Sequence, residues 1–237
     1  MSKHYKAILF DMDGTLLPMD MKEFMEGYFR LIAPKFEPFG ITHEALVPAI
    51  WKGTEAMVMN DGSRSNYDAF WDCFKKLTGV GDVEAGASCL AFYSNEFKQA
   101  KAYTQENPLA AEAVRLAHEC ADYVALATNP VFPMDGQVTR MGFVGLKPSD
   151  FDMVTSYENS RFCKPNPKYF LTICDELGAD PHECLMIGND EREDGYAADQ
   201  AGLATYIITD CMIARPECHY SGPKGNFKEM LEYLKKV

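Results

Sequence analysis

Residues 5–17 read YKAILFDMDGTLL, and this stretch decides how the rest of the chain is interpreted. Its first six residues form a short, mostly apolar run, which is typical of a buried parallel strand. Asp11, Asp13 and Gly14 follow directly and predict a polar loop at the carboxyl end of that strand. Because ligands bind beyond the carboxyl ends of strands in open α/β sheets, this loop is a candidate site.

Two more apolar runs end in polar loops in the same way. Residues 123–127 (YVALA) stop at Thr128 and Asn129, and residues 184–187 (CLMI) stop at a Gly-Asn-Asp sequence that ends in Asp190. Parallel strands present their carboxyl ends at one edge of a sheet. We therefore expect the three loops to converge on a single site.

The rest of the pattern alternates strands with helices. Two further strands are predicted at residues 153–155 and 205–208, and helices are predicted at residues 108–120, 167–177, 191–201 and 227–236. Such alternation implies parallel strands joined by crossover helices. The predicted fold class is α/β, with a Rossmann-like parallel sheet as the core.

Residues 19–103 have a different character. They contain no β-type run, and their apolar residues recur at helical spacing, as in Phe24, Tyr28 and Leu31. Proline and glycine breakers divide the stretch into about four helices. We predict a helical domain inserted after the first strand, with the core formed by residues 1–18 and 104–237.

Composition limits the partners of the chain. Its 237 residues carry a formal net charge of -12, which repels the nucleic-acid backbone and anionic lipid headgroups. Nucleic acid and membrane are therefore not expected as partners, and oligomeric state is not predicted. A phosphate-binding site in so acidic a protein needs local cations of its own.

Location is suggested by two absences in the sequence. No secretory signal begins the chain, and no apolar stretch approaches the roughly 20 residues of a membrane span. The eight cysteines include no C-x-x-C pair, which argues against a zinc ribbon or a dithiol redox centre. We expect reduced thiols and a cytoplasmic protein.

The pair Asp11 and Asp13 suits a division of labour between neighbouring carboxylates. One can attack as a nucleophile while the other transfers protons. Taken alone, the segment is equally compatible with a turn or a calcium-type loop. The other polar loops also have ordinary interpretations: a turn at Thr128, a solvated Lys164, and an acidic first helical turn after Asp190.

Together, however, these segments occur in a recognisable order. They resemble the four-motif set of the haloacid dehalogenase-like superfamily, with the motifs Asp11-x-Asp13-Gly14-Thr15, Thr128, Lys164-Pro165 and Asp190-x-x-x-Asp194. The resemblance covers residues 5–17 and about 108–210. It implies an enzyme, a hydrolase of phosphoric monoesters.

The resemblance assigns roles to the motif residues. It implies that Asp11 attacks phosphorus and forms an aspartyl phosphate, while Asp13 protonates the leaving group and then activates water. Lys164 and Thr128 are implied to hold phosphoryl oxygens. The full implied phosphate-binding set is Asp11, Gly14, Thr128, Asn129 and Lys164.

The resemblance also implies a Mg²⁺ cofactor. Its ligands would be a side-chain oxygen of Asp11, the backbone carbonyl of Asp13, and carboxylates of Asp190 and Asp194. Many family members carry Asp where this chain has Asn189, so it stays open whether Asn189 or Asp190 faces the metal. Asp194 is expected either as a direct ligand or behind one.

The predicted function is hydrolysis of a small-molecule phosphate ester under a helical cap. Asp13 disfavours dehalogenation, because a halide leaving group needs no proton donor. A phosphonate hydrolase of the family would use a cap lysine, for which Lys22 or Lys52 are candidates without a matching context. A β-phosphoglucomutase-like phosphomutase and a catalytically silent phosphate-binding protein remain alternatives.

Other chemically active residue types receive ordinary interpretations. The five histidines show no ligand spacing, and Cys163, although next to Lys164, shows no sign of activation. Trp51 and Phe70 are expected in a helical core rather than in a substrate wall. The segment 211–219 holds two cysteines and a histidine, too few ligands for a metal site.

Overall fold

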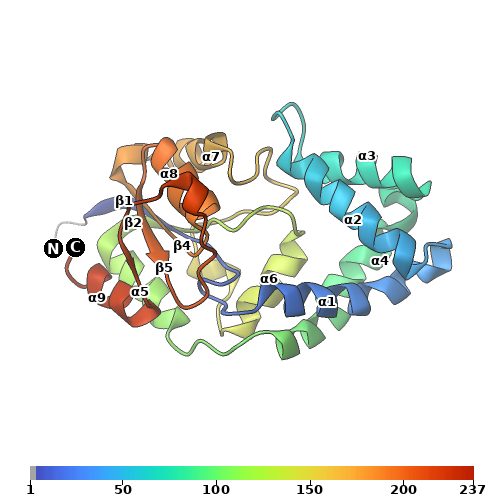
Figure 1. Cartoon of the computed structure of the whole chain (residues 1–237), viewed down its shortest axis with the longest axis horizontal. Helices are drawn as coiled ribbons and strands as arrows, with labels where there is room; N and C mark the ends of the chain where they lie inside the picture. The colour runs from blue at the N-terminus through green and yellow to red at the C-terminus, as the bar shows by residue number, and fades with distance from the viewer. Residues whose placement is uncertain (1–3) are drawn as a thin grey trace.

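The computed structural model describes residues 4–237, so residues 1–3 of the predicted core lie outside the described residues. The chain forms a six-stranded sheet in the order β3-β2-β1-β4-β5-β6, and every strand pair is parallel (Figure 1). The strands are β1 (Tyr5–Phe10), β2 (Ala121–Leu126), β3 (Met153–Val154), β4 (Cys184–Gly188), β5 (Ala204–Ile208) and β6 (Lys224–Gly225). The predicted α/β class with a Rossmann-like parallel sheet is confirmed.

Helices make up most of the remaining structure. The α-helices are α1 (Met21–Ile32), α2 (His43–Val58), α3 (Asn66–Thr78), α4 (Asp82–Ser94), α5 (Ala110–Cys120), α6 (Met134–Phe143), α7 (Pro167–Leu177), α8 (Ala197–Gln200) and α9 (Phe227–Leu234). The 3-10 helices are η1 (Ala33–Lys35), η2 (Glu37–Phe39), η3 (Glu96–Tyr103), η4 (Pro148–Asp150), η5 (Pro181–Glu183) and η7 (Pro216–Cys218), and η6 (Glu191–Tyr196) is a π-helix. Among the described residues, no helix combines the length and the apolar character that a bilayer crossing needs.

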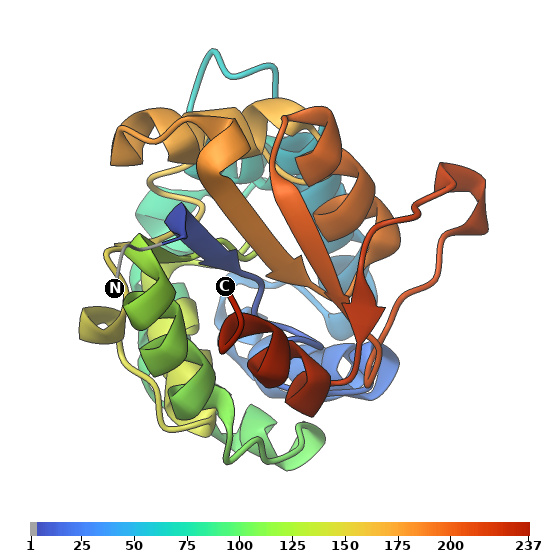
Figure 2. The same cartoon turned by 90° about the vertical axis from the view of Figure 1, so that its left-hand side faces the viewer.

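Successive residues of β1 point to opposite faces of the sheet, as strand geometry requires. Ile8 and Phe10 belong to a buried cluster that includes residues of α5 and α9. Ala7 and Leu9 belong to a second cluster, formed with residues of α7 and α8. Figure 2 shows these two helix pairs on opposite sides of the strands. The unbroken apolar run of β1 therefore reflects a strand covered on both faces.

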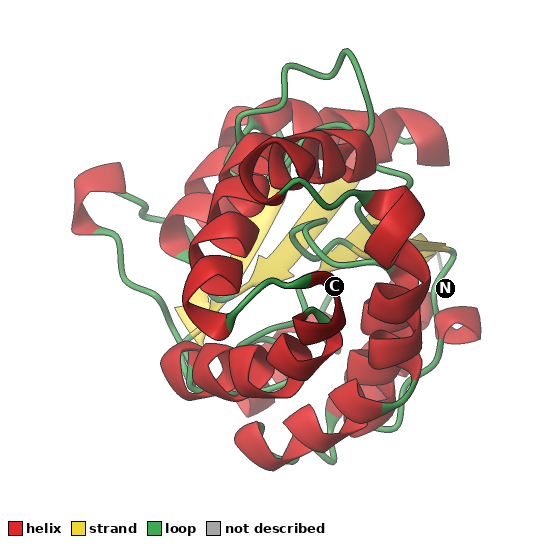
Figure 3. Cartoon of the chain, turned by 90° about the vertical axis from the view of Figure 1, so that its right-hand side faces the viewer, coloured by secondary structure: helices red, strands yellow, loops and turns green. Residues whose placement is uncertain are grey.

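Residues 19–103, which we call the helical insert, run from the end of β1 towards β2. They hold four α-helices, as predicted, and no strand occurs between Met21 and Tyr103. In Figure 1 the insert extends to the right of the sheet. Figure 3 shows the molecule from the side of the insert, with the strands behind its helices. Asp20 is the N-cap of α1, because its carboxylate accepts hydrogen bonds from the backbone N–H groups of Lys22 and Glu23.

An aromatic cluster centred on Phe97 of η3 joins the insert to the core. The Phe97 ring is fully buried and contacts the rings of Phe24 and Phe92 within the insert. It also contacts Phe132, which follows β2, and Phe143 of α6. Edge-to-face and stacked ring pairs add to the free energy gained by burial.

The predicted helix over residues 191–201 is only partly correct. The segment begins as the π-helical turn η6, in which the backbone N–H groups of both Asp194 and Gly195 donate to the carbonyl of Asp190. Helix α6 and the two-residue strand β6 were not predicted. α6 contains Gly136 and Gly142, which weaken the sequence signal for a helix.

We predict that Phe97→Ala lowers the free energy of unfolding by about 3–5 kcal/mol, because it removes a large ring from a closed cluster. Urea unfolding followed by circular dichroism measures this change. The control is Val83→Ala on α4, whose side chain is 90% exposed and whose loss is expected to cost no more than about 0.5 kcal/mol. Equal effects of the two substitutions would contradict the packing role of Phe97.

Candidate active site

The three predicted loops meet at the carboxyl edge of the sheet. Phe10 of β1 is in register with Leu126 of β2 on one side and with Ile187 of β4 on the other. Asp11 and Thr128, which lie just beyond β1 and β2, therefore come close together and line one cavity. The central position of β1 in the sheet thus explains why its carboxylates are flanked by the other two loops.

Lys164 lies at the centre of this edge. Its ammonium donates to Asp11 Oδ1 at 2.9 Å and to Asp194 Oδ1 at 2.6 Å, and its side chain is only 1% exposed. Burial alone would lower the pKa of Lys164, but the two carboxylates outweigh burial and hold this pKa above its usual value. Lys164 therefore stays charged and supplies a local cation in an acidic protein.

Asp11 is strongly affected by its surroundings. Burial raises the pKa of its carboxyl to about 7, and the negative charges of Asp194 and Asp13 act in the same direction. Lys164 opposes this rise and only partly offsets it. The Thr15 hydroxyl lies 3.4 Å from Asp11 Oδ2. A further positive charge beside Asp11 would favour its ionised form.

Asp13 is paired with a residue that the sequence analysis missed. Arg140 of α6 is fully buried and donates hydrogen bonds to Asp13 Oδ2 and to Gln137 Oε1. Its guanidinium carbon lies 4.2 Å from the centre of the Phe132 ring. The other oxygen, Asp13 Oδ1, is buried and has no hydrogen-bond partner in the structure. Nothing in the sequence around Arg140 marks it as different from a surface arginine.

Asp194 organises the loop after β4. Its Oδ2 accepts hydrogen bonds from the backbone N–H groups of Asn189 and Asp190, both at 3.0 Å, while its Oδ1 accepts from Lys164. A side chain added at Gly188 would collide with Asp194, because its Cβ would lie 2.2 Å from the Asp194 carboxyl carbon. With both oxygens engaged, Asp194 acts on the site through the lysine and the loop.

Asp190 and Asn189 have different surroundings. Asp190 begins η6 by accepting from the backbone N–H groups of Arg192 and Glu193, and its Oδ2 lies 3.3 Å from the guanidinium of Arg215. Asn189 accepts from the Thr15 hydroxyl at 3.2 Å and donates to a backbone carbonyl at 2.8 Å. Both residues line the cavity, where Asn189 contributes an amide that links loops and Asp190 contributes a carboxylate.

Gly14 and Asn129 were both predicted to bind phosphate, and this stays a prediction. Gly14 adopts a positive φ of 84°, and its N–H donates to the carbonyl of Leu17. Any side chain there would meet Asn189 at 2.2 Å. The Asn129 amide accepts from the Lys164 N–H at 3.2 Å and donates to Glu193 at 3.0 Å, so it positions the lysine loop.

Glu193 is a second residue that the sequence analysis passed over. Burial raises the pKa of its carboxyl to about 7, and the charge of Asp194 adds to this effect. It lines the same cavity as Asp11. The acidic run after β4 contains this residue, so its position was visible in the sequence although its burial was not.

The donor set suits a hard cation. Among the described residues, no group of three or more His, Cys, Asp or Glu side chains forms a metal-binding cluster. Mg²⁺, however, is usually held by one or two carboxylates together with substrate oxygens and water. Asp11 and Asp190 supply such carboxylates to the wall of one cavity.

The cavity has a volume of about 440 Å³ and extends from these carboxylates to the helical insert. Trp51 and Phe70 both line it. Trp51 is 49% exposed, so its expected place in a helical core is wrong, whereas Phe70 packs against the buried core as well. Neither Lys22 nor Lys52 lines the cavity, and Lys52 instead pairs with Glu55 on the surface of α2. None of the five histidines, all within the described part of the chain, lines it either.

Two buried carboxylates, Asp11 and Asp194, and the buried Lys164 thus meet at the carboxyl edge of a parallel sheet, the position where open α/β sheets bind ligands. The family model for haloacid dehalogenase-like hydrolases matches residues 5–202. The chain belongs to the haloacid dehalogenase-like hydrolase family, and the resemblance inferred from its motifs is confirmed.

Individual relatives agree with this family. A glyceraldehyde 3-phosphate phosphatase of Methanopyrus kandleri is 25% identical over 206 residues, which are 86% of this chain and 83% of the relative. A 2-haloacid dehalogenase structure from Pseudomonas syringae pv. Tomato is 17% identical, with a TM-score of 0.64 over 98% of this chain and 99% of that one. The magnesium-bound hydrolase YfnB of Bacillus subtilis is 20% identical, with a TM-score of 0.58 over 98% and 99%.

These structures share the fold, and the fold alone does not separate a dehalogenase from a phosphatase. The family makes the chain an enzyme of the hydrolase class. The relative from Methanopyrus kandleri supports the predicted phosphatase type.

We predict that Asp11→Asn stabilises the metal-free protein at pH 8 and much less at pH 5. The folded-state pKa of Asp11, about 7, exceeds its ordinary value of 3.8, so folding stability falls as pH rises between these values. The neutral amide removes this cost. The melting temperature in EDTA should rise by roughly 2–4 °C for each kcal/mol regained.

The control for this experiment is Asp175→Asn on the exposed surface of α7, which should leave the melting temperature unchanged at both pH values. A gain from Asp11→Asn that is the same at pH 5 and pH 8 would show that burial of the charge is not its source.

Proposed function

We propose that the protein is a Mg²⁺-dependent phosphatase that hydrolyses a small phosphate ester through an aspartyl-phosphate intermediate on Asp11. The observation that carries the proposal is the buried ammonium of Lys164, which lies within hydrogen-bond distance of both Asp11 and Asp194. Such a cation can neutralise the nucleophile and a phosphoryl oxygen at the same time. The phosphatase relative supports the same reaction class.

In the first step, an oxygen of Asp11 attacks phosphorus, and the bond from phosphorus to the leaving oxygen breaks. Lys164 and Thr128 hold the phosphoryl oxygens during this transfer. Thr128 is buried, and its carbonyl accepts hydrogen bonds from Tyr169 and Thr155, so its backbone is held in place at the cavity wall. Two easier steps replace one difficult hydrolysis.

Asp13 transfers the protons. It gives one to the leaving alkoxide and later takes one from the water that attacks the aspartyl phosphate, which releases phosphate and restores Asp11. The hydrogen bond from Arg140 to Oδ2 orients the carboxyl, and Oδ1 is left without a partner in the structure. We propose that Oδ1 carries the proton.

Asp11, the backbone carbonyl of Asp13 and Asp190 would hold Mg²⁺, with Asp194 acting behind them through Lys164. When bound, the ion stabilises negative charge on the phosphoryl oxygens and on Asp11. The magnesium-bound relative with this fold supports the choice of cation. Burial raises the pKa of Asp11, and a bound cation beside this carboxyl would lower that pKa and favour the ionised nucleophile.

The helical insert is proposed to act as the cap of this site, with residues 1–18 and 104–237 as the catalytic core. Its helices contribute Met25, Trp51 and Phe70 to the wall of the cavity that contains Asp11. A cap of this kind excludes water from the aspartyl phosphate and contacts the substrate. All eight cysteines are free thiols, which suits the proposed cytoplasmic location.

We predict that the parent protein releases phosphate from p-nitrophenyl phosphate only with added Mg²⁺, and that Asp11→Asn abolishes this release. The amide lacks the nucleophilic charge that attacks phosphorus. Steady-state assays with and without EDTA measure both effects, and Asp175→Asn is the matched control. Unchanged release after Asp11→Asn would contradict the role of Asp11 as the nucleophile. No release from the parent protein with Mg²⁺ would contradict the proposal and favour a silent binding protein.

We predict that Asp13→Asn lowers steady-state turnover by about 10²–10⁴-fold, the usual contribution of acid–base catalysis. p-Nitrophenolate leaves without a proton, so this substrate should still show a burst of product equal to one enzyme equivalent. An alkyl phosphate should show no burst, because its alkoxide needs the proton. Rapid-quench assays compare the two, and equal first-turnover losses would contradict the acid role of Asp13.

A further inference from the structure

The cavity continues well beyond the carboxylates into the helical insert. Side chains of α1, α2, α3 and α4 line this part of the cavity, from its interior to its rim, and we call it the apolar chamber: Tyr28, Ile32, Ile50, Trp51, Phe70 and Tyr93. A volume of about 440 Å³ falls within the range of about 300–1,000 Å³ that is usual for pockets holding a whole small-molecule ligand. The cavity as a whole therefore has room for more than a phosphoryl group.

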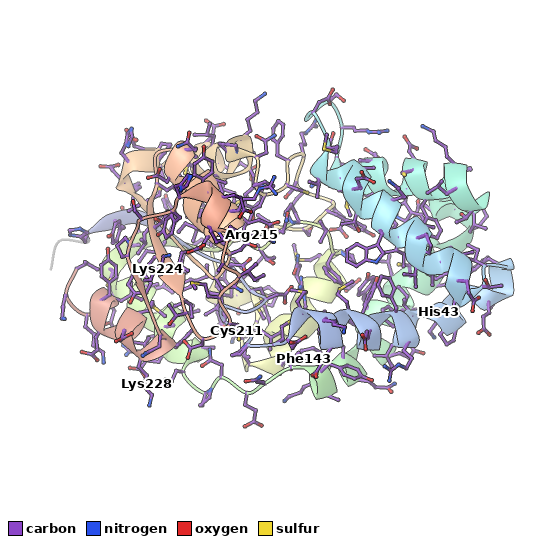
Figure 4. All side chains as sticks on the ribbon, in the orientation of Figure 1. His43, Phe143, Cys211, Arg215, Lys224 and Lys228 are labelled. Carbon is purple, nitrogen blue, oxygen red and sulfur yellow. The ribbon has the colours of Figure 1, made fainter. Side chains whose placement is uncertain are left out.

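The chamber offers no charge to a substrate. Of the described residues that line the cavity, Arg215 alone is cationic, and it belongs to the core. Its guanidinium faces Asp190, and Figure 4 labels it on the side of the core towards the insert, far from His43 at the outer end. A substrate with a carboxylate or a second phosphate would find no partner in the chamber.

Polar groups are equally scarce there. The hydroxyls of Tyr28 and Tyr93 hydrogen-bond to each other at 2.8 Å, and both side chains are buried. Thr54 is the remaining hydroxyl among the described cavity residues of the insert. A sugar or glycerol unit would lose hydrogen bonds to water and gain few in return, which disfavours its binding.

Apolar surface at the rim of the cavity is left open. The Trp51 side chain is 49% exposed and Met21 is 41% exposed, although both line the cavity. Large apolar side chains left exposed beside a cavity often mark a site that binds an apolar ligand. Because these residues share a cavity with Asp11, a ligand held there reaches the proposed nucleophile.

We infer that the substrate is a phosphate monoester of an apolar alcohol, either arylalkyl or medium-chain alkyl, whose hydrocarbon part fills the apolar chamber. This inference rests on the proposed phosphatase function and adds the class of substrate. The phosphate lies at Lys164, and the hydrocarbon part lies against Trp51 and Phe70. Stacking on these rings favours an aromatic group.

The test compares kcat/KM for ethyl, butyl and hexyl phosphate, 2-phenylethyl phosphate, phosphoglycolate and glycerol 3-phosphate, with Mg²⁺. We expect kcat/KM to rise by about fourfold for each added methylene, the value of burying one such group. Phosphoglycolate and glycerol 3-phosphate should be poorer substrates than hexyl phosphate. Equal or better hydrolysis of these polar esters would overturn the inference while leaving the phosphatase function intact. Failure to hydrolyse any ester, p-nitrophenyl phosphate included, would overturn both.

Substitutions in the chamber give a second test that does not depend on the fraction of folded enzyme. Trp51→Ala should lower the ratio of kcat/KM for hexyl over ethyl phosphate by about tenfold, as expected for lost apolar contacts in a pocket. Leu90→Ala is the control, since Leu90 on α4 is also exposed but does not line the cavity. An unchanged ratio in Trp51→Ala would place the hydrocarbon part elsewhere and overturn the inference.

A charge introduced into the chamber should reverse the preference. Thr54→Lys places an ammonium on α2 within the cavity wall, where the native side chain is a small hydroxyl. We expect phosphoglycolate to become a better substrate relative to hexyl phosphate. No change in this ratio would show that position 54 does not face the bound alcohol, against the inference.

Discussion

The buried ammonium of Lys164 is the interaction on which the rest of this site depends. Without it, Asp11 and Asp194 would be two buried carboxylates with no cation beside them, and buried unpaired charges are costly. Asp194 also accepts the N–H groups that shape the loop after β4, so the lysine links that loop to the loop after β1. Catalytic charge and loop geometry are stabilised by one cation.

A second buried cation, Arg140, pairs with the other carboxylate of the first loop. Arg140 is buried against Phe132 and holds Asp13, as Lys164 holds Asp11. The two carboxylates of the first loop therefore have separate partners from different elements, which gives neighbouring acids different surroundings. Net acidity over the whole chain is compatible with phosphate chemistry because these cations act locally.

The helical insert adds an environment of the opposite kind. Its cavity wall is aromatic and aliphatic, whereas the core side is rich in carboxylates. The aromatic cluster around Phe97 attaches the insert to the sheet, so the two surfaces form one cavity. In the proposed function, the carboxylate end carries out the reaction and the apolar end selects the alcohol.

The sequence alone determined the parallel sheet, the helical insert and the positions of Asp11, Asp13, Thr128 and Lys164, because strand periodicity and motif order are local properties of the chain. Tertiary structure decided the pairing of Asp13 with Arg140, 127 residues away, and the burial of Glu193. It also placed Trp51 and Phe70 in the wall of the cavity, although Phe70 packs against the buried core as well. An apolar residue at helical spacing looks the same in sequence whether it faces a neighbouring helix or a ligand, and only packing in three dimensions separates the two.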